Sequence, residues 1–372
     1  MESLNSARRW WRLTRKIIQA NRNQLTKPFK LTYVVTKECH SRCVHCHIWK
    51  ERPNNELTLS EITEFTKNSP FLSWVDFTGG EPTDRPDIVE VVEAFVENCP
   101  DLMLMHFPTN GLKPQRCFEI CKKILALKSG RLVVSVSIDG PPAVNDSLRG
   151  IKGDFALAVQ TYKLLKTLPK LDVYVGMTLF PKNMDLIDAL VLAIQKEIPG
   201  FRYKDLHVNL PHTSSHYYQN QSIDRIKLDR HALLQHINNF SKKRGIPMSP
   251  FAWVEKMYQR EVAKYLSDGN CPQDCGALMT QVYLAADGTL YPCSMWDVSL
   301  GNIREWKYSM APGLESQEAK KLRSELLQKK CPNCWTPCEA YSTLASNIFR
   351  FKSRVPELPI IGTVGNKIRE VA

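Results

Sequence analysis

Short apolar runs alternate with amphipathic stretches along residues 31–245. Apolar runs typical of buried strands lie at residues 31–35, 74–77, 102–107, 132–138, 173–179 and 206–210. After each run, apolar positions recur every three to four residues, which predicts helices at residues 59–67, 87–98, 116–128, 155–168, 184–197 and 223–244. These βα units predict a parallel sheet with helices outside it. Because they number six and a closed barrel has eight, we expect an α/β fold, a partial (β/α)6 TIM-like barrel, over residues 31–245.

The pattern changes after residue 245. Two proline-containing steps, at residues 246–247 and 249–250, mark a joint between two parts of the chain. Beyond it we expect a helix at residues 253–266, a hairpin of strands 281–285 and 289–291 around an Asp-Gly turn, and a helix at residues 317–330. Because these elements bury little apolar surface, residues 246–345 are predicted to be a small cysteine-rich α+β domain held together by a metal cluster. Residues 346–372 are predicted to be a basic tail.

Residues 1–30 predict a basic amphipathic helix before the first strand. One arc of this helix holds its apolar residues, which are Leu4, Ala7, Trp10, Trp11, Ile17 and Ile18. The opposite arc holds its basic residues, which are Arg8, Arg9, Arg12, Arg15 and Lys16. The pattern fits two alternatives. The helix either binds an anionic membrane surface or acidic partner, or it docks its apolar face on its own domain and leaves the arginines in solvent.

The composition is that of a globular protein. Of the 372 residues, 43% are hydrophobic and 24% are charged, which excludes disordered and low-complexity classes. No uncharged apolar run approaches the ~18 residues that span a bilayer. The N-terminal residues lack the apolar core of a secretory signal. We therefore expect a cytoplasmic protein, with the first helix as its one candidate for peripheral membrane contact.

The positive charge lies at the two ends of the sequence. The formal net charge is +12, yet residues 31–320 hold 33 basic and 33 acidic side chains. Residues 1–30 hold 8 basic and 1 acidic side chains, and residues 321–372 hold 9 and 4. A nucleic-acid-binding protein usually carries a basic face on its folded body. Because the body here is neutral, we expect no specific nucleic-acid partner.

The 12 cysteines need an explanation other than disulfides, because a reducing compartment keeps thiols reduced. Cys99, Cys117 and Cys121 are scattered over expected helices and are predicted to be small buried apolar residues. The others fall into two groups, at residues 39–46 and 271–338. Grouped cysteines in such a protein more often bind metal.

The first group consists of Cys39, Cys43 and Cys46, at the end of the first predicted strand. Three thiolates in one loop can bind a four-iron cluster, which has four ligand positions, so one iron stays open for substrate or cofactor. Zinc is the alternative metal, and a histidine of the same loop would then complete its site; the candidates are His40, His45 and His47.

A second motif, Gly79-Gly80-Glu81-Pro82, ends the second predicted strand. Together with the cysteine loop it resembles the radical S-adenosylmethionine (radical SAM) superfamily, in the order of elements over about residues 31–245. The resemblance implies that the three cysteines bind a [4Fe–4S] cluster whose open iron is chelated by S-adenosylmethionine. One position departs from the family pattern, because His45 stands where an aromatic residue usually precedes the third cysteine. A flat imidazole can still stack.

The resemblance also implies residues that hold the cofactor. Gly79, Gly80, Glu81 and Pro82 would receive the methionyl amine, and the glycines would let the backbone approach closely. Asn110 and Ser137 lie where family members contact the methionyl carboxylate and the ribose, and Thr178 and Asn209 are weaker candidates. For each of these polar residues the alternative is an ordinary hydrogen bond to backbone at a strand end.

The second cysteine group, with the hairpin and the late Cys-x-x-Cys, resembles the SPASM/twitch extension of the same superfamily. It has fewer cysteines than a full SPASM domain, so we expect the shorter form with one auxiliary [4Fe–4S] cluster. The ligands we expect are Cys275, Cys293, Cys331 and Cys334, with Cys338 and Cys271 as weaker candidates. A four-cysteine zinc site is the alternative.

The resemblance implies a reaction but not a substrate. An electron, from a donor such as flavodoxin or ferredoxin, would cleave S-adenosylmethionine to a 5′-deoxyadenosyl radical that takes hydrogen from a small molecule or a peptide. The auxiliary cluster would either accept an electron or position substrate. His212, after the sixth strand, is a weak candidate for acid–base chemistry. Because residues 1–30 alone precede the first strand, we expect no N-terminal peptide-binding domain of the kind peptide-modifying relatives often carry.

Overall fold

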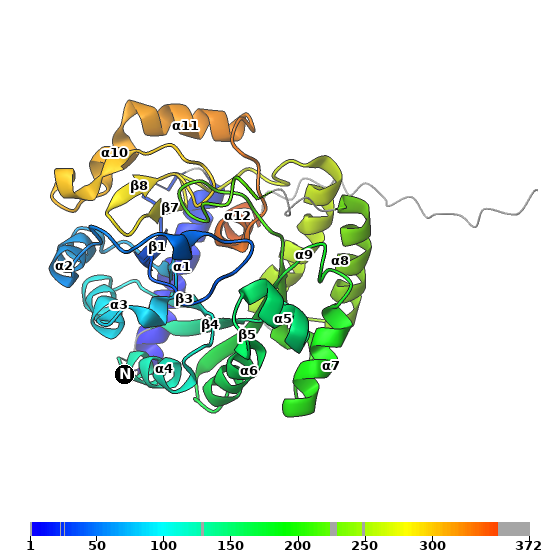
Figure 1. The fold of residues 1–372 in the computed structure, drawn as a ribbon. Helices are drawn as coiled ribbons and strands as arrows, with labels where there is room; N and C mark the ends of the chain where they lie inside the picture. The colour runs from blue at the N-terminus through cyan, green and yellow to red at the C-terminus, as the bar shows by residue number, and fades with distance from the viewer. Residues whose placement is uncertain are drawn as a thin grey trace, which may run out of the picture.

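A computed structural model describes residues 2–22, 24–25, 27–127, 130–223, 229–247 and 250–348. Its centre is one nine-stranded sheet with the strand order β6-β5-β4-β3-β2-β1-β7-β8-β9. Strands β1 to β6 are all parallel, and each pairs with the next one along the chain. In Figure 1, helices α2, α3, α4 and α6 form an outer rim around this parallel part. The expected partial barrel of six βα units is confirmed.

The parallel part agrees closely with the expected elements. Its strands are β1 (Lys30–Thr36), β2 (Trp74–Gly79), β3 (Leu104–Thr109), β4 (Arg131–Ser137), β5 (Leu171–Thr178) and β6 (Leu206–Asn209). Its helices are α2 (Leu59–Lys67), α3 (Ile88–Asn98), α4 (Pro114–Ala126), α5 (Pro142–Arg149), α6 (Asp154–Leu165), α7 (Ile187–Glu197) and α8 (Arg230–Arg244).

Two features of this part differ from the prediction. Helix α5 was not expected, because it is short and lies directly after the strand-end loop that carries two prolines. The last helix was expected from residue 223, but α8 begins at Arg230. Asp229 caps it, since its carboxylate accepts hydrogen bonds from the backbone N–H groups of His231 at 2.9 Å and Ala232 at 3.1 Å. Residues 224–228 of the expected helix lie outside the described part of the chain.

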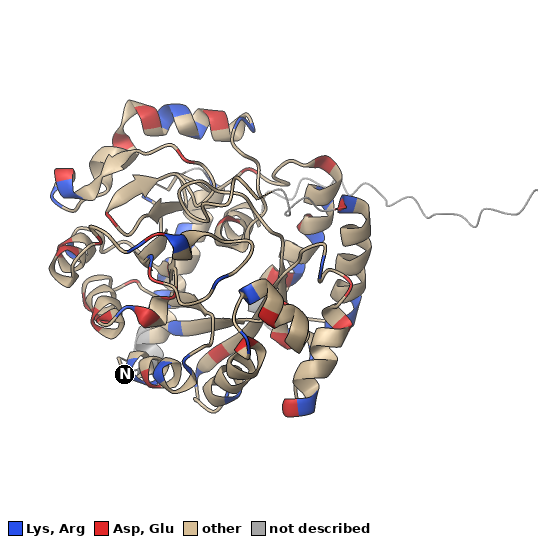
Figure 2. Ribbon diagram, in the orientation of Figure 1, with Lys and Arg blue, Asp and Glu red and all other residues tan. Residues whose placement is uncertain are grey.

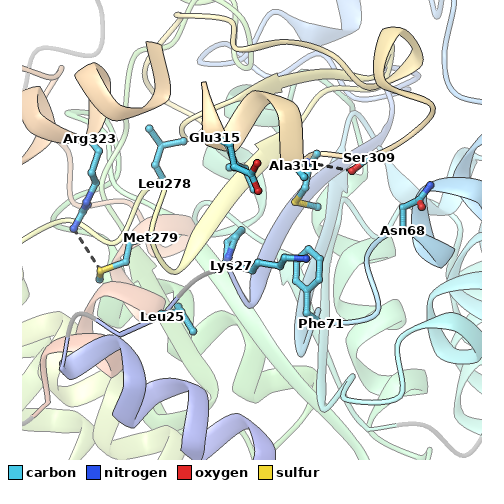
Figure 3. A pocket seen from close by; sticks show the side chains of 13 residues that line it. Leu25, Lys27, Asn68, Phe71, Leu278, Met279, Ser309, Ala311, Glu315 and Arg323 are labelled. Atoms are coloured by element: carbon cyan, nitrogen blue, oxygen red, sulfur yellow. Dashed lines mark hydrogen bonds between the residues drawn. The ribbon is translucent and has the colours of Figure 1, made fainter. Parts of the chain in front are cut away.

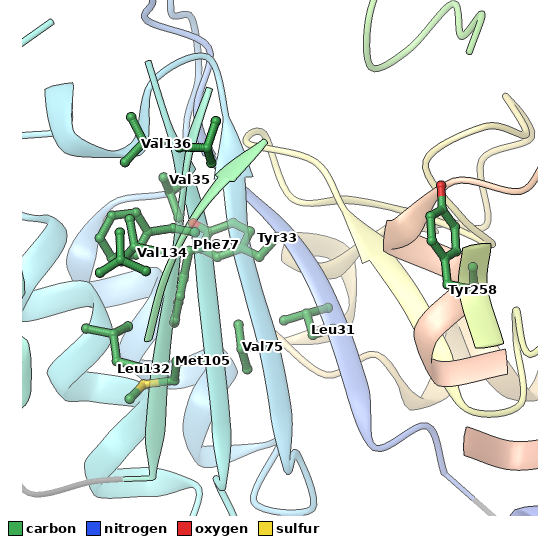
Figure 4. Packing of buried hydrophobic residues seen from close by; sticks show 14 of the residues in the cluster. Leu31, Tyr33, Val35, Val75, Phe77, Met105, Leu132, Val134, Val136 and Tyr258 are labelled. Atoms are coloured by element: carbon green, nitrogen blue, oxygen red, sulfur yellow. The ribbon is translucent and has the colours of Figure 1, made fainter. Parts of the chain in front are cut away.

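Alternate positions of the strands face the helices and form one apolar core. Leu31, Tyr33 and Val35 of β1 are all buried in it, as are Phe77 of β2 and Val134 of β4 (Figure 4). The two-residue repeat of a strand explains this selection, since every second side chain points to the same face. The three scattered cysteines are also buried, as predicted: Cys99, Cys117 and Cys121.

The cysteine-rich region continues the same sheet. Strand β7 (Gln281–Leu284) pairs in parallel with β1, with Lys30 opposite Gln281. Strands β8 (Thr289–Tyr291) and β9 (Gly301–Asn302) follow in antiparallel order. The Asp-Gly hairpin is therefore present as expected, but its first strand extends the barrel sheet, which the local pattern did not reveal. The boundary at residue 246 stays a prediction.

The remaining helices surround this hairpin. They are α9 (Pro250–Asp268), α10 (Ala311–Glu315), α11 (Gln317–Leu327) and α12 (Pro337–Asn347). Helices α10 and α12 were not expected from the sequence. In Figure 1, α10 and α11 lie over the hairpin on the side away from α4 and α6.

Helix α1 (Glu2–Asn21) docks on the barrel through part of its surface. Leu13 and Ala20 are buried in a small cluster with Phe29 and Met103. Lys16 reaches the same surface, and its Nζ lies 2.8 Å from a carboxylate oxygen of Asp101. The other part of the helix stays open to solvent: the exposed apolar residues there are Trp10, Trp11 and Ile18. The helix therefore docks on its own domain, but through Leu13, Ala20 and Lys16 of the basic arc, whereas much of the predicted apolar arc stays exposed. Membrane contact of that exposed arc stays a prediction.

Basic and acidic side chains are interspersed over the helices of the barrel (Figure 2). This distribution agrees with the neutral balance of residues 31–320. Among the described residues, no helix is both long and apolar enough to cross a bilayer.

Candidate functional site

The first cysteine group lies in the loop that leaves β1, at the carboxyl end of the parallel strands. Backbone hydrogen bonds fix this loop on the end of α5: the N–H of Arg42 donates to the carbonyl of Arg149 at 2.9 Å, and that of Val44 to Leu148 at 3.0 Å. The guanidinium of Arg42 also donates to the carbonyl of Cys39 at 3.0 Å. The loop is therefore held on both sides of Cys43.

The glycines at the end of β2 let a second strand end approach this loop. The N–H of Gly80 donates to the carbonyl of Thr36 at 2.8 Å, and that of Glu81 to Glu38 at 2.7 Å. A Cβ atom on Gly80 would lie 2.1 Å from the carbonyl oxygen of Glu38, and Gly79 has a φ of +139°. Neither position accepts a side chain without moving the backbone. The Gly-Gly motif thus joins the ends of β1 and β2.

The thiols of this loop are partly shielded from water, since Cys39 and Cys46 are half-buried. Burial raises the pKa of Cys39 to about 12, and burial does the same for Cys46. Cys43 is buried, and its pKa is also raised. A thiolate in such a place needs a positive partner, because desolvation penalises the charged form. A bound metal cluster meets this need, since it binds cysteine as thiolate.

Sequence reasoning missed a cation beside these thiols. Arg149, the last residue of α5, is buried, and it lies close enough to Cys43 for each to shift the pKa of the other. Burial alone would lower the pKa of its guanidinium, but Cys43 and Asp139 raise it. Its Nη1 lies 3.3 Å from a carboxylate oxygen of Asp139. Because α5 itself was not expected, no pattern in the sequence placed this arginine at the cysteine loop.

Glu81 is held by protein donors. One carboxylate oxygen accepts from the Thr83 hydroxyl at 2.6 Å and the Thr109 hydroxyl at 2.9 Å. The other accepts from the N–H of Asn110 at 2.6 Å. Burial raises the pKa of this carboxyl group, and these donors act in the opposite direction. Glu81 therefore links the end of β2 to the end of β3 by hydrogen bonds, and this structural role is separate from any contact with a ligand.

Replacing Glu81 with glutamine is expected to weaken S-adenosylmethionine binding by about tenfold while leaving the iron content unchanged. The amide keeps the volume of the side chain but cannot accept at both ends, so the strand-end loop at Asn110 shifts. Isothermal titration of the reconstituted protein, together with iron analysis, measures both quantities. Glu90→Gln on α3 is the matched control, and equal affinities in the two variants would contradict this role.

Asn110 and Ser137 lie at the ends of neighbouring strands, as predicted. Asn110 is buried, and its Oδ1 accepts from the N–H of Leu112 at 3.0 Å. Its Nδ2 is buried and has no hydrogen-bond partner within the described part of the chain. Ser137 ends β4 and is half-buried. A buried amide N–H without an acceptor is costly, so Asn110 offers a donor to a bound ligand.

The weaker candidates Thr178 and Asn209 take part in ordinary strand-end hydrogen bonds. The N–H of Thr178 donates to Oδ1 of Asp139 at 2.8 Å. The carbonyl of Asn209 accepts from Leu179 at 2.9 Å. Both contacts are made by backbone groups, so the roles of the two side chains stay predictions.

Two histidines near the site are half-buried, and desolvation favours their neutral forms. The ring of His45 stacks on Phe180, with ring centres 4.6 Å apart, and burial lowers its pKa to about 4. This imidazole therefore takes the stacking place of the aromatic residue. His212 packs near Tyr265, at 6.1 Å between ring centres, and burial lowers its pKa to about 4. Because Tyr265 belongs to α9, these contacts lie on the side of the second cysteine group.

The structure gathers four cysteines of the second group. Cys293 is buried in a cluster with Tyr217 and Tyr283, and the partly buried cysteines packed against this cluster are Cys275, Cys331 and Cys334. These four are the ligands expected from the sequence. Burial raises the pKa of Cys334, and the neighbouring Glu339, Cys293 and Cys275 act in the same direction. The position of Cys334 thus disfavours a thiolate that has no metal, whereas the contact with Cys271 lowers the pKa of Cys275.

The other two cysteines of this region differ. Cys271 is buried, and its thiol contacts that of Cys275. Cys338 lies on α12, and its carbonyl accepts a hydrogen bond from Lys30 at the start of β1. Burial raises the pKa of Cys338 to about 12, with Glu339 as its first charged neighbour. Cys271 therefore adjoins the group of four, whereas Cys338 lies near Glu339 and Lys30 and near the rings of Tyr217 and Tyr283.

Among the described residues, no three Cys, His, Asp or Glu side chains converge on one position for a single metal ion. In an iron–sulfur cubane each thiolate binds a different iron atom, so its cysteines surround the cluster.

Two cavities open near the hairpin. One, of about 290 Å³, has a lining that includes Lys37, Glu51, His216, Tyr291 and Asp297. The other, of about 210 Å³, is lined by residues around Met279 and α10. Figure 3 shows Lys27, Phe71, Met279 and Arg323 around it, and Arg323 also donates to the carbonyl of Ala277 at 2.9 Å.

Two family models match this chain. The radical SAM superfamily model matches residues 33–193, which include the first cysteine loop and the Gly-Gly motif. The model of the SPASM iron–sulfur cluster-binding domain matches residues 275–335, which include Cys275, Cys293, Cys331 and Cys334.

Several curated proteins are similar over part or most of the chain. The subtilosin biosynthesis protein AlbA of Bacillus subtilis is 24% identical over 85% of this chain and 68% of AlbA. The mycofactocin maturase MftC of Mycolicibacterium smegmatis is 30% identical over 46% of this chain and 43% of MftC. The AdoMet-dependent heme synthase of Methanosarcina barkeri is 26% identical over 82% of this chain and 88% of that protein. The chain therefore spans about two thirds of AlbA and less than half of MftC.

Solved structures share the fold. Native anSMEcpe with bound AdoMet superposes with a TM-score of 0.56 at 15% identity, over 87% of this chain and 98% of that chain. Streptococcus suis SuiB bound to the precursor peptide SuiA superposes with a TM-score of 0.52 at 15% identity, over 90% of this chain and 76% of that chain.

Proposed function

Since the chain belongs to the radical SAM superfamily and carries a SPASM domain, we propose that it modifies a peptide by radical chemistry. The observation that carries the proposal is the cysteine loop of β1, held against the Gly-Gly end of β2 and beside the buried Arg149. Bound at this loop, the [4Fe–4S] cluster would supply the electron that cleaves S-adenosylmethionine to methionine and a 5′-deoxyadenosyl radical, which takes hydrogen from the substrate.

The residues at this end of the barrel fit the cofactor. At Gly79 and Gly80 the neighbouring backbone lies so close that a Cβ atom would overlap it. Next to these glycines, the unpaired Nδ2 of Asn110 offers a donor for an anionic or carbonyl oxygen. Arg149 supplies a buried positive charge for thiolates or a carboxylate. These groups match the amine, carboxylate and ribose of S-adenosylmethionine in chemical type.

This chain's own residues would bind and orient the cofactor and would exclude water from it. Cys39, Cys43 and Cys46 would hold the cluster, and Glu81 would keep the ends of β2 and β3 in register for the ligand. The stacked pair of His45 and Phe180 closes one side of the site with flat apolar surfaces. Exclusion of water protects a reactive radical from side reactions.

The second cysteine group would hold an auxiliary cluster next to the substrate. Cys275, Cys293, Cys331 and Cys334 are its proposed ligands, with Cys271 as the alternative at its edge. The cavity of about 290 Å³ is lined by Lys37 and Glu51 on one side and by Tyr291 of the hairpin on the other, and a substrate would enter there. An auxiliary cluster there would accept an electron from a product radical, or position the substrate.

The names of the relatives support a peptide as the substrate. AlbA is named for bacteriocin biosynthesis and MftC as a maturase, and SuiB is described with a precursor peptide. A porphyrin is the second candidate, because the similarity to the heme synthase covers more of both chains than the similarity to MftC.

The experiment is an anaerobic assay of the reconstituted, reduced protein. With S-adenosylmethionine alone it is expected to release 5′-deoxyadenosine slowly. Adding a candidate precursor peptide encoded beside the gene is expected to accelerate release and to remove hydrogen atoms from the peptide, seen by mass spectrometry. Acceleration by an iron-loaded porphyrin alone would favour the second candidate, and absence of any cofactor cleavage would refute both.

A further inference from the structure

One loop contacts both cysteine groups. This bridging loop, residues 212–220, follows β6 and crosses from the first cysteine loop to the hairpin. Its contact with the first group is made mainly by Asn220, whose Nδ2 donates to the carbonyl of His45 at 2.9 Å and to the carbonyl of His212 at 2.9 Å. In addition, the carbonyl of Tyr218 accepts from the N–H of His47 at 2.8 Å. His45 and His47 are the two neighbours of Cys46 in the sequence.

The same loop holds the second group. The hydroxyl of Ser214 donates to the carbonyl of Ser294 at 2.8 Å, directly after Cys293. Nε2 of His216 lies 3.1 Å from the carbonyl of Cys293, and the ring of His216 stacks on Tyr291 with centres 4.3 Å apart. These bonds reach the backbone of the cysteine itself and of the residue that follows it.

A hydrogen bond within the loop joins its two ends. Oδ1 of Asn220 accepts from the N–H of Ser214 at 2.9 Å. Asn220 is 2% exposed and Ser214 is 2% exposed, so water does not replace these contacts. Each polar atom of the Asn220 side chain therefore has a partner, and the chain of bonds runs from His45 through Asn220 and Ser214 to Ser294.

The loop also fills the space between the groups. The hydroxyls of Tyr217 and Thr78 lie 2.5 Å apart, and Thr78 directly precedes the Gly-Gly motif. Burial raises the pKa of Tyr217, and the neighbouring Cys338 and Cys46 act in the same direction, which locates this ring between α12 and the first cysteine loop. The ring of Tyr217 is tilted against that of Tyr218, with centres 4.4 Å apart.

We propose that Asn220 is a positioning residue for the first cluster, and that the bridging loop couples the geometry of the two cluster sites. The physical reason is that a satisfied buried hydrogen-bond chain moves as a unit, since breaking one bond leaves a costly unpaired group. A shift at the hairpin is therefore passed to the backbone on either side of Cys46. This inference rests on the proposed function, because it requires both sites to hold clusters.

The test uses the reconstituted full chain and four single variants. Asn220→Ala breaks the chain at its centre, and Ser214→Ala breaks it on the hairpin side, away from any residue of the first cysteine loop. Ser214→Thr keeps the hydroxyl, and Gln221→Ala alters the exposed neighbour of Asn220 as a matched control. The measurements are iron content, the rate of 5′-deoxyadenosine release, and the change that S-adenosylmethionine causes in the electron paramagnetic resonance spectrum of the reduced protein.

We expect Asn220→Ala to retain its iron but to release 5′-deoxyadenosine about tenfold more slowly, with an altered S-adenosylmethionine-induced spectrum. Ser214→Ala is expected to alter that spectrum in the same direction, whereas Ser214→Thr and Gln221→Ala behave as the unmodified protein. In the double variant of Asn220→Ala and Ser214→Ala, the rate is expected to fall no further than in Asn220→Ala, because both break the same chain.

The outcome that overturns the inference is equally specific. If Ser214→Ala leaves the spectrum unchanged, or the two effects on the rate simply multiply, the loop does not couple the sites. Should Asn220→Ala fail to fold, the comparison of Ser214→Ala with Ser214→Thr still decides the question. If the unmodified protein itself shows no spectral change with S-adenosylmethionine, the proposed function fails instead.

Discussion

Replacing Cys43 with alanine is expected to abolish release of 5′-deoxyadenosine from S-adenosylmethionine, a loss of at least about a thousandfold. The loop that carries Cys43 is fixed on both sides by backbone bonds to α5, so no other thiol can move into its place. With two thiolates left, the loop holds no stable four-iron cluster, and the electron cannot reach the sulfonium. The assay is chromatography of the products after anaerobic incubation with dithionite.

Cys121→Ala is the matched control for this variant. Cys121 is as deeply buried as Cys43 but lies on the apolar face of α4, away from either group. Its loss is expected to lower thermal stability slightly and to leave cofactor cleavage intact. Normal cleavage by the Cys43→Ala protein would show that the loop does not carry the cluster.

The second large effect concerns the number of iron atoms. The reconstituted protein is expected to hold about eight, as two [4Fe–4S] clusters, and the triple variant of Cys39, Cys43 and Cys46 to alanine about four. The physical reason is that the two cysteine groups lie on different parts of the chain, the loop after β1 and the segments around the hairpin that precede α12, so each can be filled without the other. Iron and sulfide analysis with Mössbauer spectroscopy gives both numbers.

Cys334→Ala removes one proposed ligand of the second site and leaves the first site unchanged. Cys334 is packed among the four grouped cysteines, so its loss is expected to remove about four irons. Cys338→Ala is the comparison, because Cys338 is not one of these four proposed ligands, and it is expected to retain nearly all of the iron. Stoichiometric zinc in place of iron at this site would refute an auxiliary iron–sulfur cluster.

The barrel was predictable because its signals are local. Apolar runs with a two-residue repeat and amphipathic runs with a 3.6-residue repeat identify strands and helices without knowledge of distant contacts. Helix α2 was predicted over residues 59–67 and is observed as Leu59–Lys67, with a capping box between Thr58 and Glu61. The place of the cysteine loop and of Gly79 and Gly80 follows in the same way, since parallel strands bring their carboxyl ends to one edge.

Short elements and long-range pairings were not predictable. Helices α5 and α10 are too brief, and too dependent on their neighbours, for a periodic signal. The pairing of β7 with β1 joins residues about 250 positions apart in the sequence, and nothing in either strand specifies the other.

What the sequence determined by itself is therefore the order of βα units and the residue types at the strand ends, because both depend on neighbours along the chain. What only the tertiary structure decided is which groups meet. It brought Arg149 beside Cys43, paired Glu81 with Thr109 and Asn110, and gathered Cys275, Cys331 and Cys334 around the cluster that holds Cys293. These outcomes depend on burial and on hydrogen bonds between distant segments, for which a local pattern carries no information.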